Sequence, residues 1–144
     1  MSEYLHLLCS QCGTRNRVPP ARLKEDPRCG KCRAELLSGR PIDLPGALWH
    51  RFLAGNELPL VVYFWASWCG HCRNFHTVFA EAAAAFRWQA HFVRIETEEQ
   101  PELARQYAIK GLPTQIVFNR GREIARQAGA APLPVFSQWL EKHL

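Results

Sequence analysis

The hydrophobic pattern is strongest between Leu60 and Ala66, where the chain is continuously apolar and rich in β-branched and aromatic residues. A short run without polar alternation is typical of a strand buried on both faces of a sheet. After Cys69-Gly70-His71-Cys72 the apolar positions recur at three- and four-residue steps, which predicts an amphipathic helix. The residues on its apolar face are Phe75, Val78, Phe79, Ala82 and Phe86. The two cysteines therefore lie at a strand-to-helix junction.

Weaker patterns predict the elements on either side of this junction. Before the junction we expect an edge strand at 41–43 and a helix at about 44–54, with Asp43 as its N-cap and Leu48, Phe52 and Leu53 facing inward. After the helix that follows the cysteines we expect a strand at 91–96, a short helix at 98–107, and strands at 115–119 and 123–127. A last helix begins at Pro132, and its inner face consists of Val135, Phe136, Trp139 and Leu140. Strands that alternate with helices predict an α/β domain, in which a parallel central sheet flanked by helices fits.

The composition sets limits on the class of protein. The chain has 144 residues, of which 47% are hydrophobic, enough for one domain with a real core and a small appendage. No apolar run is long enough to span a membrane, and residues 1–6 have no basic region of the kind that opens a signal peptide. We therefore expect a cytoplasmic protein without a membrane partner.

All six cysteines lie in C-x-x-C pairs, and the first two pairs predict a metal site. Sixteen residues separate Cys9-x-x-Cys12 from Cys29-x-x-Cys32, which is within the spacing of four-cysteine zinc sites. The segment between the pairs has few core-forming residues, so a metal would supply the folding energy of residues 1–38. We expect one structural Zn²⁺; iron, a second redox-active dithiol and disulfides are the alternatives. This unit could recruit a partner or stabilise the domain at 39–144.

The turns of the two pairs differ in sequence. Gly13 follows the first pair, at a position that often needs positive φ, but Arg33 follows the second, so we expect a less regular second turn. The formal charge of +5 falls to +3 if four thiolates bind one Zn²⁺, which is a mild excess. We therefore expect no nucleic-acid partner.

The third pair is placed for thiol chemistry. Cys69 is predicted at a helix N-terminus, where unpaired N–H groups and the helix dipole favour a thiolate, the nucleophile of disulfide exchange. Cys72 lies three residues later on the same side of the first turn, so it can attack a mixed disulfide formed at Cys69. His71 adds a polar group that would further favour the Cys69 thiolate.

The segment from Phe64 to Cys72, Phe-Trp-Ala-Ser-Trp-Cys-Gly-His-Cys, resembles the active site of the thioredoxin family. The resemblance extends over about residues 40–144 and includes Leu112-Pro113-Thr114, Gly121 and Gly129. With the four-cysteine unit, the whole chain resembles the cytosolic bacterial group called thioredoxin 2. The resemblance implies a thioredoxin fold, with a mixed central sheet flanked by helices and a small N-terminal zinc ribbon.

The resemblance also implies an activity and roles for individual residues. It implies a monomeric thiol–disulfide oxidoreductase that reduces disulfide-containing protein substrates and is recharged by a thioredoxin reductase. Cys69 would be the nucleophile and Cys72 the resolving thiol. Trp68 and Gly70 belong to the active-site segment, with Trp68 exposed to contact the substrate. Pro113 resembles the family's proline that follows a cis peptide bond, which would turn the backbone of Leu112 toward the substrate.

Two departures from the family pattern concern the chemistry. His71 replaces the usual proline and resembles protein disulfide isomerase, so the disulfide should be more oxidising. Tyr63 aligns with the family's buried aspartate, and a phenol with a pKa of about 10 is no base at neutral pH. Arg94 aligns with the lysine that pairs with that acid, so we expect it to lose its partner. We expect Cys72 to resolve mixed disulfides more slowly, or to use water or His71 as base.

Two other functions remain open from the sequence. His71 and Tyr63 could have shifted the protein toward a disulfide isomerase or oxidant. Alternatively, the chain could be a zinc-dependent binding module on a thioredoxin scaffold. The retained pair Cys69 and Cys72 argues against the second alternative, because a scaffold needs no dithiol.

Overall fold

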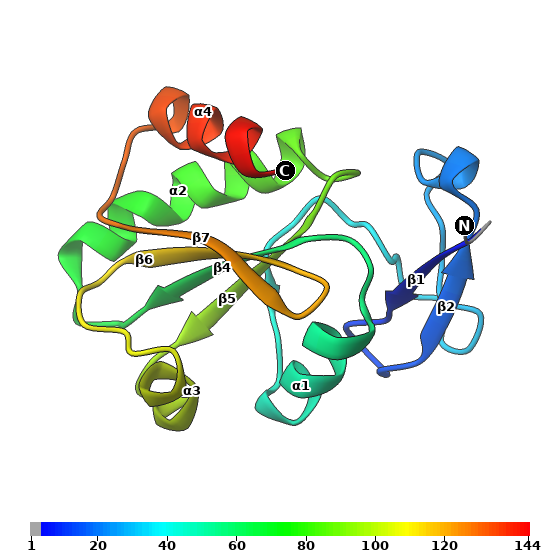
Figure 1. The fold of residues 1–144 in the computed structure, drawn as a ribbon, viewed down its shortest axis with the longest axis horizontal. Coiled ribbons are helices and arrows are strands. Elements are labelled where there is room, and N and C mark those ends of the chain that lie inside the picture. Colours follow the sequence, from blue (N-terminus) through cyan, green and yellow to red (C-terminus); the bar gives the residue numbers. More distant parts are fainter. Residues whose placement is uncertain (1–3) are drawn as a thin grey trace.

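The computed structural model describes residues 4–144, which form two small sheets and the helices around the larger one (Figure 1). Its elements in chain order are β1 (Leu5–Leu8), β2 (Arg15–Val18), the 3-10 turn η1 (Pro20–Arg22), β3 (Ile42–Asp43), α1 (Gly46–Gly55), β4 (Leu60–Trp65), α2 (Gly70–Ala85), β5 (His91–Glu96), α3 (Pro101–Gln106), β6 (Thr114–Asn119), β7 (Arg122–Ala128) and α4 (Leu133–His143). Within residues 4–144, no helix combines the length and apolar character needed to cross a bilayer.

The larger sheet is mixed, with the strand order β3-β5-β4-β6-β7. Strands β3, β5 and β4 run parallel, whereas β6 is antiparallel to β4 and to β7. The parallel sheet predicted from the alternation of elements is therefore correct for three strands only. The mixed sheet expected from the resemblance is confirmed.

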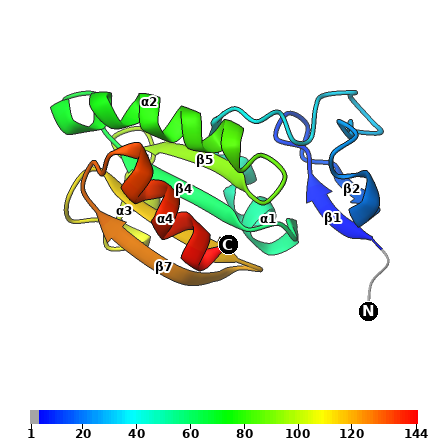
Figure 2. The ribbon, with the colours of Figure 1, turned by 90° about the horizontal axis from the view of Figure 1, so that it is seen from above.

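Helices cover both faces of this sheet. Figures 1 and 2 show α2 and α4 on one face and α1 and α3 on the other. Along β4, Val61 and Tyr63 belong to the core beneath α2 and α4, whereas Leu60, Val62 and Phe64 belong to the core on the opposite side. Successive side chains of a strand point to opposite faces, so an unbroken apolar run is what a strand between two helical layers requires.

The first sheet is the hairpin of β1 and β2, which lies beside α1 at one end of the larger domain (Figures 1 and 2). Its own small core, with Leu7, Leu36 and Leu37 among its members, also includes Leu58 from the segment before β4. The hairpin unit and the larger domain thus share buried surface. The predicted boundary between residues 38 and 39 stays a prediction.

A buried polar network joins these two parts. His91, at the start of β5, donates from Nε2 to the Leu36 carbonyl (2.8 Å) and accepts at Nδ1 from the Asn56 amide (2.9 Å). The Asn56 side-chain oxygen accepts the Leu8 backbone N–H at 3.1 Å. The two bonds made by His91 together require the neutral imidazole with its proton on Nε2. Burial lowers the pKa of His91, which favours this neutral form.

Some predicted details were wrong. Asp43 is no N-cap, because it lies in β3 and α1 begins three residues later, after Pro45. The predicted helix at 98–107 is shorter and begins at Pro101, whose missing N–H suits a first helical position. In α4, Phe136 and Leu140 are buried as predicted, but Val135 is 51% exposed.

We predict that the free energy of unfolding of the zinc-loaded protein falls as the pH drops below about 6.5. The unfolded chain binds a proton on His91 there while the folded protein does not, and each such site contributes up to about 1.4 kcal/mol per pH unit. Urea titrations at pH 7.5, 6.5 and 5.5 measure this slope. In His91→Gln the slope should be smaller, whereas the exposed His50→Gln should match the wild type. An equal slope in all three proteins would show that His91 does not couple folding to pH.

Candidate functional site

The junction between β4 and α2 brings the third cysteine pair together. Cys69 is the N-cap of α2 and forms a disulfide with Cys72, with 5.3 Å between their Cα atoms. The Cys69 sulfur also accepts the Cys72 backbone N–H at 3.2 Å. This is the N-terminal position predicted from the sequence. When the disulfide is reduced, the N–H group and the helix dipole favour a thiolate on Cys69.

The two sulfurs differ in their access to solvent. Cys69 keeps 5% of its surface exposed, whereas Cys72 has none. Beside Cys69, Trp68 is 64% exposed, which confirms its predicted place at the surface. Gly70 has open space where a side chain would lie, and His71 is exposed as well. Cys69 is thus the cysteine of the pair that keeps some contact with solvent, and it lies next to an exposed apolar ring.

The loop before β6 lies at the same edge of the sheet. The peptide bond between Leu112 and Pro113 is cis, as predicted. Leu112 packs against the core cluster that contains Cys69 and Cys72. Thr114, the first residue of β6, is paired with Phe64 near the end of β4. The structure therefore brings Pro113 to the edge of the sheet at which β4 leads into the cysteine pair.

Tyr63 lies beneath the cysteine pair and is completely buried. Its hydroxyl donates to the Cys72 carbonyl at 2.7 Å and lies 2.8 Å from Nδ1 of His76. The ring packs between Phe75 and Phe79 of α2. Burial raises the pKa of Tyr63 above its ordinary value, so the group is a neutral phenol at physiological pH.

Arg94 is not left without a partner, contrary to our expectation. Its guanidinium binds both carboxylate oxygens of Asp43, with Nε to Oδ1 at 2.9 Å and Nη2 to Oδ2 at 2.6 Å. The two residues are direct partners in the pairing of β3 with β5, and Arg94 is likewise opposite Tyr63 in β4. The acid that pairs with Arg94 therefore lies at the edge of the sheet and not beneath the cysteines.

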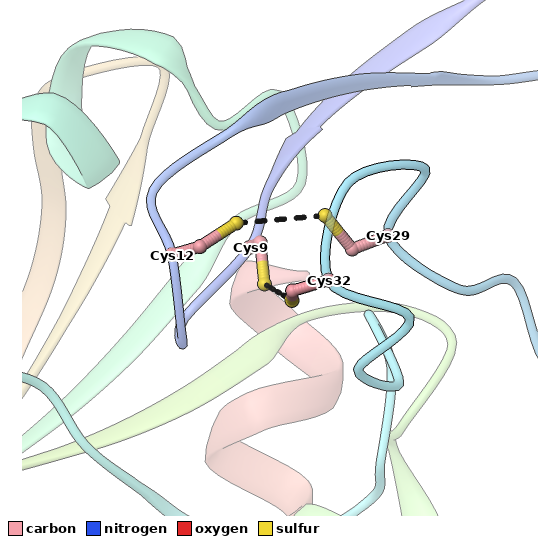
Figure 3. Close-up of side chains that lie close together, drawn as sticks. All are labelled: Cys9, Cys12, Cys29 and Cys32. Atoms are coloured by element: carbon pink, nitrogen blue, oxygen red, sulfur yellow. Dashed lines mark hydrogen bonds between the residues drawn. The ribbon is translucent and has the colours of Figure 1, made fainter.

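The other four cysteines gather at the tips of two turns. Their sulfur atoms all lie within 4.8 Å of one another, and Figure 3 shows the two pairs facing each other. The shortest separations are 3.5 Å between Cys9 and Cys32 and 3.6 Å between Cys12 and Cys29. Zn–S bonds of about 2.3 Å in a tetrahedron place sulfurs about 3.8 Å apart. Four thiolates with this spacing fit a tetrahedral Zn²⁺.

The two turns have the same backbone conformation. Gly13 and Arg33 both have positive φ, and their N–H groups bond to the Cys9 and Cys29 carbonyls at 2.9 and 3.0 Å. The expectation of a less regular second turn was therefore wrong: Arg33 adopts the left-handed conformation in spite of its side chain. A backbone N–H bond lowers the pKa of Cys29 to about 6, whereas burial raises that of Cys9 to about 12. A cation among the sulfurs would favour the thiolate of all four.

Sequence reasoning missed His76, which the structure places in contact with Tyr63. Its position could have been inferred, because a residue four places after Cys72 lies on the same face of the helix. The hydrogen bond between His76 and Tyr63 could not be inferred, because it depends on how α2 packs on the sheet. Sequence reasoning also missed Asn56 and His91, whose network becomes visible only when the hairpin unit is placed against the domain.

Models of known families match both parts of the chain. The Thioredoxin model matches residues 42–142, and the model described as the N-terminal zinc ribbon of thioredoxin 2 matches residues 8–34. Thioredoxin C-3 of Corynebacterium nephridii is 34% identical over 138 residues, which cover 96% of this chain and 94% of that protein. Thioredoxin 1 of a Nostoc species is 39% identical over 62% of this chain and 83% of that protein.

Solved structures agree with these matches. A thioredoxin from Fasciola hepatica has a TM-score of 0.57 and 26% identity, covering 61% of this chain and 83% of that one. A thioredoxin variant from Halobacterium salinarum has a TM-score of 0.65 over 73% of this chain and 91% of that one, and at 22% identity it supports the fold alone. With its cysteine pair at the start of α2, the chain belongs to the thioredoxin family and is a thiol–disulfide oxidoreductase with disulfide reductase activity.

Proposed function

We propose that the chain reduces disulfides of protein substrates, with Cys69 as nucleophile and Cys72 as resolving thiol. The Cys69 thiolate attacks a substrate disulfide, forms a mixed disulfide and releases one substrate thiolate. The Cys72 sulfur then attacks the Cys69 sulfur, which releases the second substrate thiolate and forms the Cys69–Cys72 disulfide. Two electrons pass to the substrate, and a reductase must return two electrons to the pair.

The observation that carries these roles is the different surroundings of the two sulfurs. Cys69 accepts a backbone N–H at the start of a helix and is reachable, whereas Cys72 is fully buried behind it. A stabilised and accessible thiolate suits the attacking role, and a buried thiol next to it suits the resolving role. Exposed Trp68 would supply an apolar contact for a peptide next to Cys69, and the loop at Pro113 lies at the same edge of the sheet. Gly70 leaves room for that peptide to approach.

We propose further that Cys9, Cys12, Cys29 and Cys32 hold one structural Zn²⁺. The fit of their sulfur spacing to a tetrahedral ion supports this, as do N–H bonds from Gln11 and Lys31 to the Cys9 and Cys29 sulfurs, both 3.4 Å. Thiolate ligands persist in a reducing compartment, so the cytoplasm is the location we propose. There, an enzyme of the thioredoxin reductase type would be the electron donor.

We also propose that the chain acts as a monomer in electron transfer to cellular disulfides. Among the described residues, one chain supplies both cysteines, Trp68 and the loop at Pro113, so no second copy is needed to complete the site. The part of the chain that carries the four other cysteines, called the zinc unit below, packs against the end of the domain opposite the Cys69–Cys72 pair. The contacts are the cluster that includes Leu58 and the hydrogen-bond network of His91. That position favours a stabilising role for the unit over a part in the exchange reaction.

We predict that Cys69→Ser lowers turnover of a fluorescently labelled peptide disulfide by on the order of 10³-fold, because no nucleophile remains. Cys72→Ser should also lose turnover but accumulate a mixed disulfide with the peptide on Cys69, which mass spectrometry of proteolytic fragments identifies. Ser67→Ala, a neighbouring exposed change, should keep turnover. An adduct that forms on a zinc-unit cysteine, or on Cys72 in Cys69→Ser at the wild-type rate, would contradict the assigned roles.

We predict that Cys32→Ser removes the metal and unfolds the zinc unit alone. Cys32 is the exposed ligand, so its substitution changes little besides coordination, and its exposed neighbour Lys31→Ser is the matched control. Zinc content by atomic emission should fall from one ion per chain to a minor fraction. Amide hydrogen exchange of β1 and β2 should quicken at least about tenfold, while β4 stays protected. Full zinc content in Cys32→Ser would overturn the assigned ligand set.

A further inference from the structure

A fully buried amide lies on the face of the sheet against which the cysteine pair packs. Gln115 of β6 has no exposed surface, and its strand partner in β4 is Tyr63. Its side chain faces α2 and α4, because Val117, two residues later in the strand, belongs to the core on that side. Such a core is usually filled by apolar side chains, so a buried amide in this position calls for an explanation.

The two polar atoms of this amide are bonded differently. Nε2 of Gln115 donates to the Gly129 carbonyl at 3.1 Å, whereas Oε1 is buried and has no partner within residues 4–144. The identity of the two atoms is fixed, because a carbonyl accepts a hydrogen bond but cannot donate one. An unpaired buried acceptor costs free energy, so the amide is not the side chain that stability alone would favour.

The bond from Gln115 ends on the segment that joins β7 to α4. Gly129 in this segment has a φ of +107°, and its own N–H donates to the Pro113 carbonyl at 2.8 Å. Both backbone groups of Gly129 are thus held, one by the loop at Pro113 and the other by Gln115. Two residues later, Ala131 packs against the core cluster of the cysteine pair. The amide therefore ties together two loops that lie next to this pair.

We propose that Gln115 is a positioning residue for peptide substrates, an inference that rests on the proposed reduction of protein disulfides. By holding the Gly129 carbonyl, Gln115 keeps the segment at 129–131 in place beside the loop at Pro113. Gly129 is exposed and has open space where a side chain would lie, so an extended peptide can approach its backbone closely. Gln115 touches neither the substrate nor a sulfur in this scheme and acts through Gly129.

Two features favour this role over mere support of the fold. Gly129 is exposed, so water could satisfy its carbonyl if the amide were absent. An apolar side chain at position 115 would also remove the unpaired oxygen from the core. Folding therefore does not depend on Gln115, whereas a single conformation of the loop does. A loop that is ordered before the peptide arrives lowers the entropic cost of binding.

The test compares a large and a small substrate on zinc-loaded, reduced protein in stopped flow. The large one is a fluorescently labelled peptide disulfide, which can contact both loops, and the small one is Ellman's reagent, which needs only the Cys69 thiolate. In Gln115→Leu the second-order rate constant with the peptide should fall at least about fivefold, because the ordered loop is lost. The rate constant with Ellman's reagent should change less than about twofold, and the reduction potential of the pair against glutathione should not change.

Two further measurements separate positioning from support of the fold. The melting temperature of Gln115→Leu should equal or exceed that of the wild type, because an unpaired buried oxygen has been removed. Hydrogen exchange of the Gly129 amide, followed by NMR, should quicken at least about fivefold. Gln127→Leu is the matched control, because Gln127 is the partner of Gln115 in β7 and its amide nitrogen has no partner among the described residues. This control should leave both rate constants unchanged.

A second variant guards against a packing defect. Gln115→Met keeps the length of the side chain without its donor and should behave as Gln115→Leu does. A wild-type rate constant with the peptide in both variants would overturn the positioning role. So would equal slowing with both disulfides, or an equal loss with the peptide in Gln127→Leu. A wild type that reduces the peptide no faster than free dithiothreitol would instead defeat the proposed function, and the positioning role with it.

Discussion

The burial of β4 on both faces is the constraint on which the rest of this structure depends. A strand between two helical layers has its alternate side chains committed to opposite cores, so a shift by one residue would exchange every one of them. Tyr63 faces α2 for this reason, and Val62 and Phe64 face the other layer. The end of the same strand fixes the start of α2, and with it the cap position of Cys69. The chemistry of the cysteine pair is thus set by the packing of the strand before it.

The same register aligns polar residues across the sheet. Asp43, Arg94 and Tyr63 are successive partners in β3, β5 and β4, and they lie on the side of α2. The charged members lie toward the edge, where the ion pair is partly hydrated and its desolvation cost is small. The uncharged phenol occupies the deeper position. In this row of three residues, the charged side chains therefore lie at the edge of the sheet and the uncharged one lies nearest the cysteines.

Much of this arrangement could be predicted from the sequence because it depends on local rules. The apolar run, the spacing of the cysteines and the positive φ at Gly13 follow from strand periodicity, metal geometry and turn stereochemistry. What could not be predicted depends on tertiary contacts. Asp43 directly precedes the predicted helix and was therefore interpreted as its N-cap. Its actual partner, Arg94, lies 51 residues away in the sequence, so the ion pair could not be foreseen. Arg33 adopts positive φ because the fold of its turn requires it, although an arginine alone would avoid that conformation.

A tyrosine beneath a redox dithiol has an electrostatic consequence that differs from that of a buried acid. A carboxylate in this position would bring a charge into the core and would need a cation or several donors to offset its desolvation. Here Arg94 is already bound to Asp43, so a buried carboxylate would compete for it. The phenol and the imidazole carry no net charge while the disulfide is intact. His76, which contacts the phenol, lines a surface cavity where water can solvate its ring. The core beneath the cysteines can therefore stay apolar and well packed, because the side chain in the position of the acid is a neutral phenol.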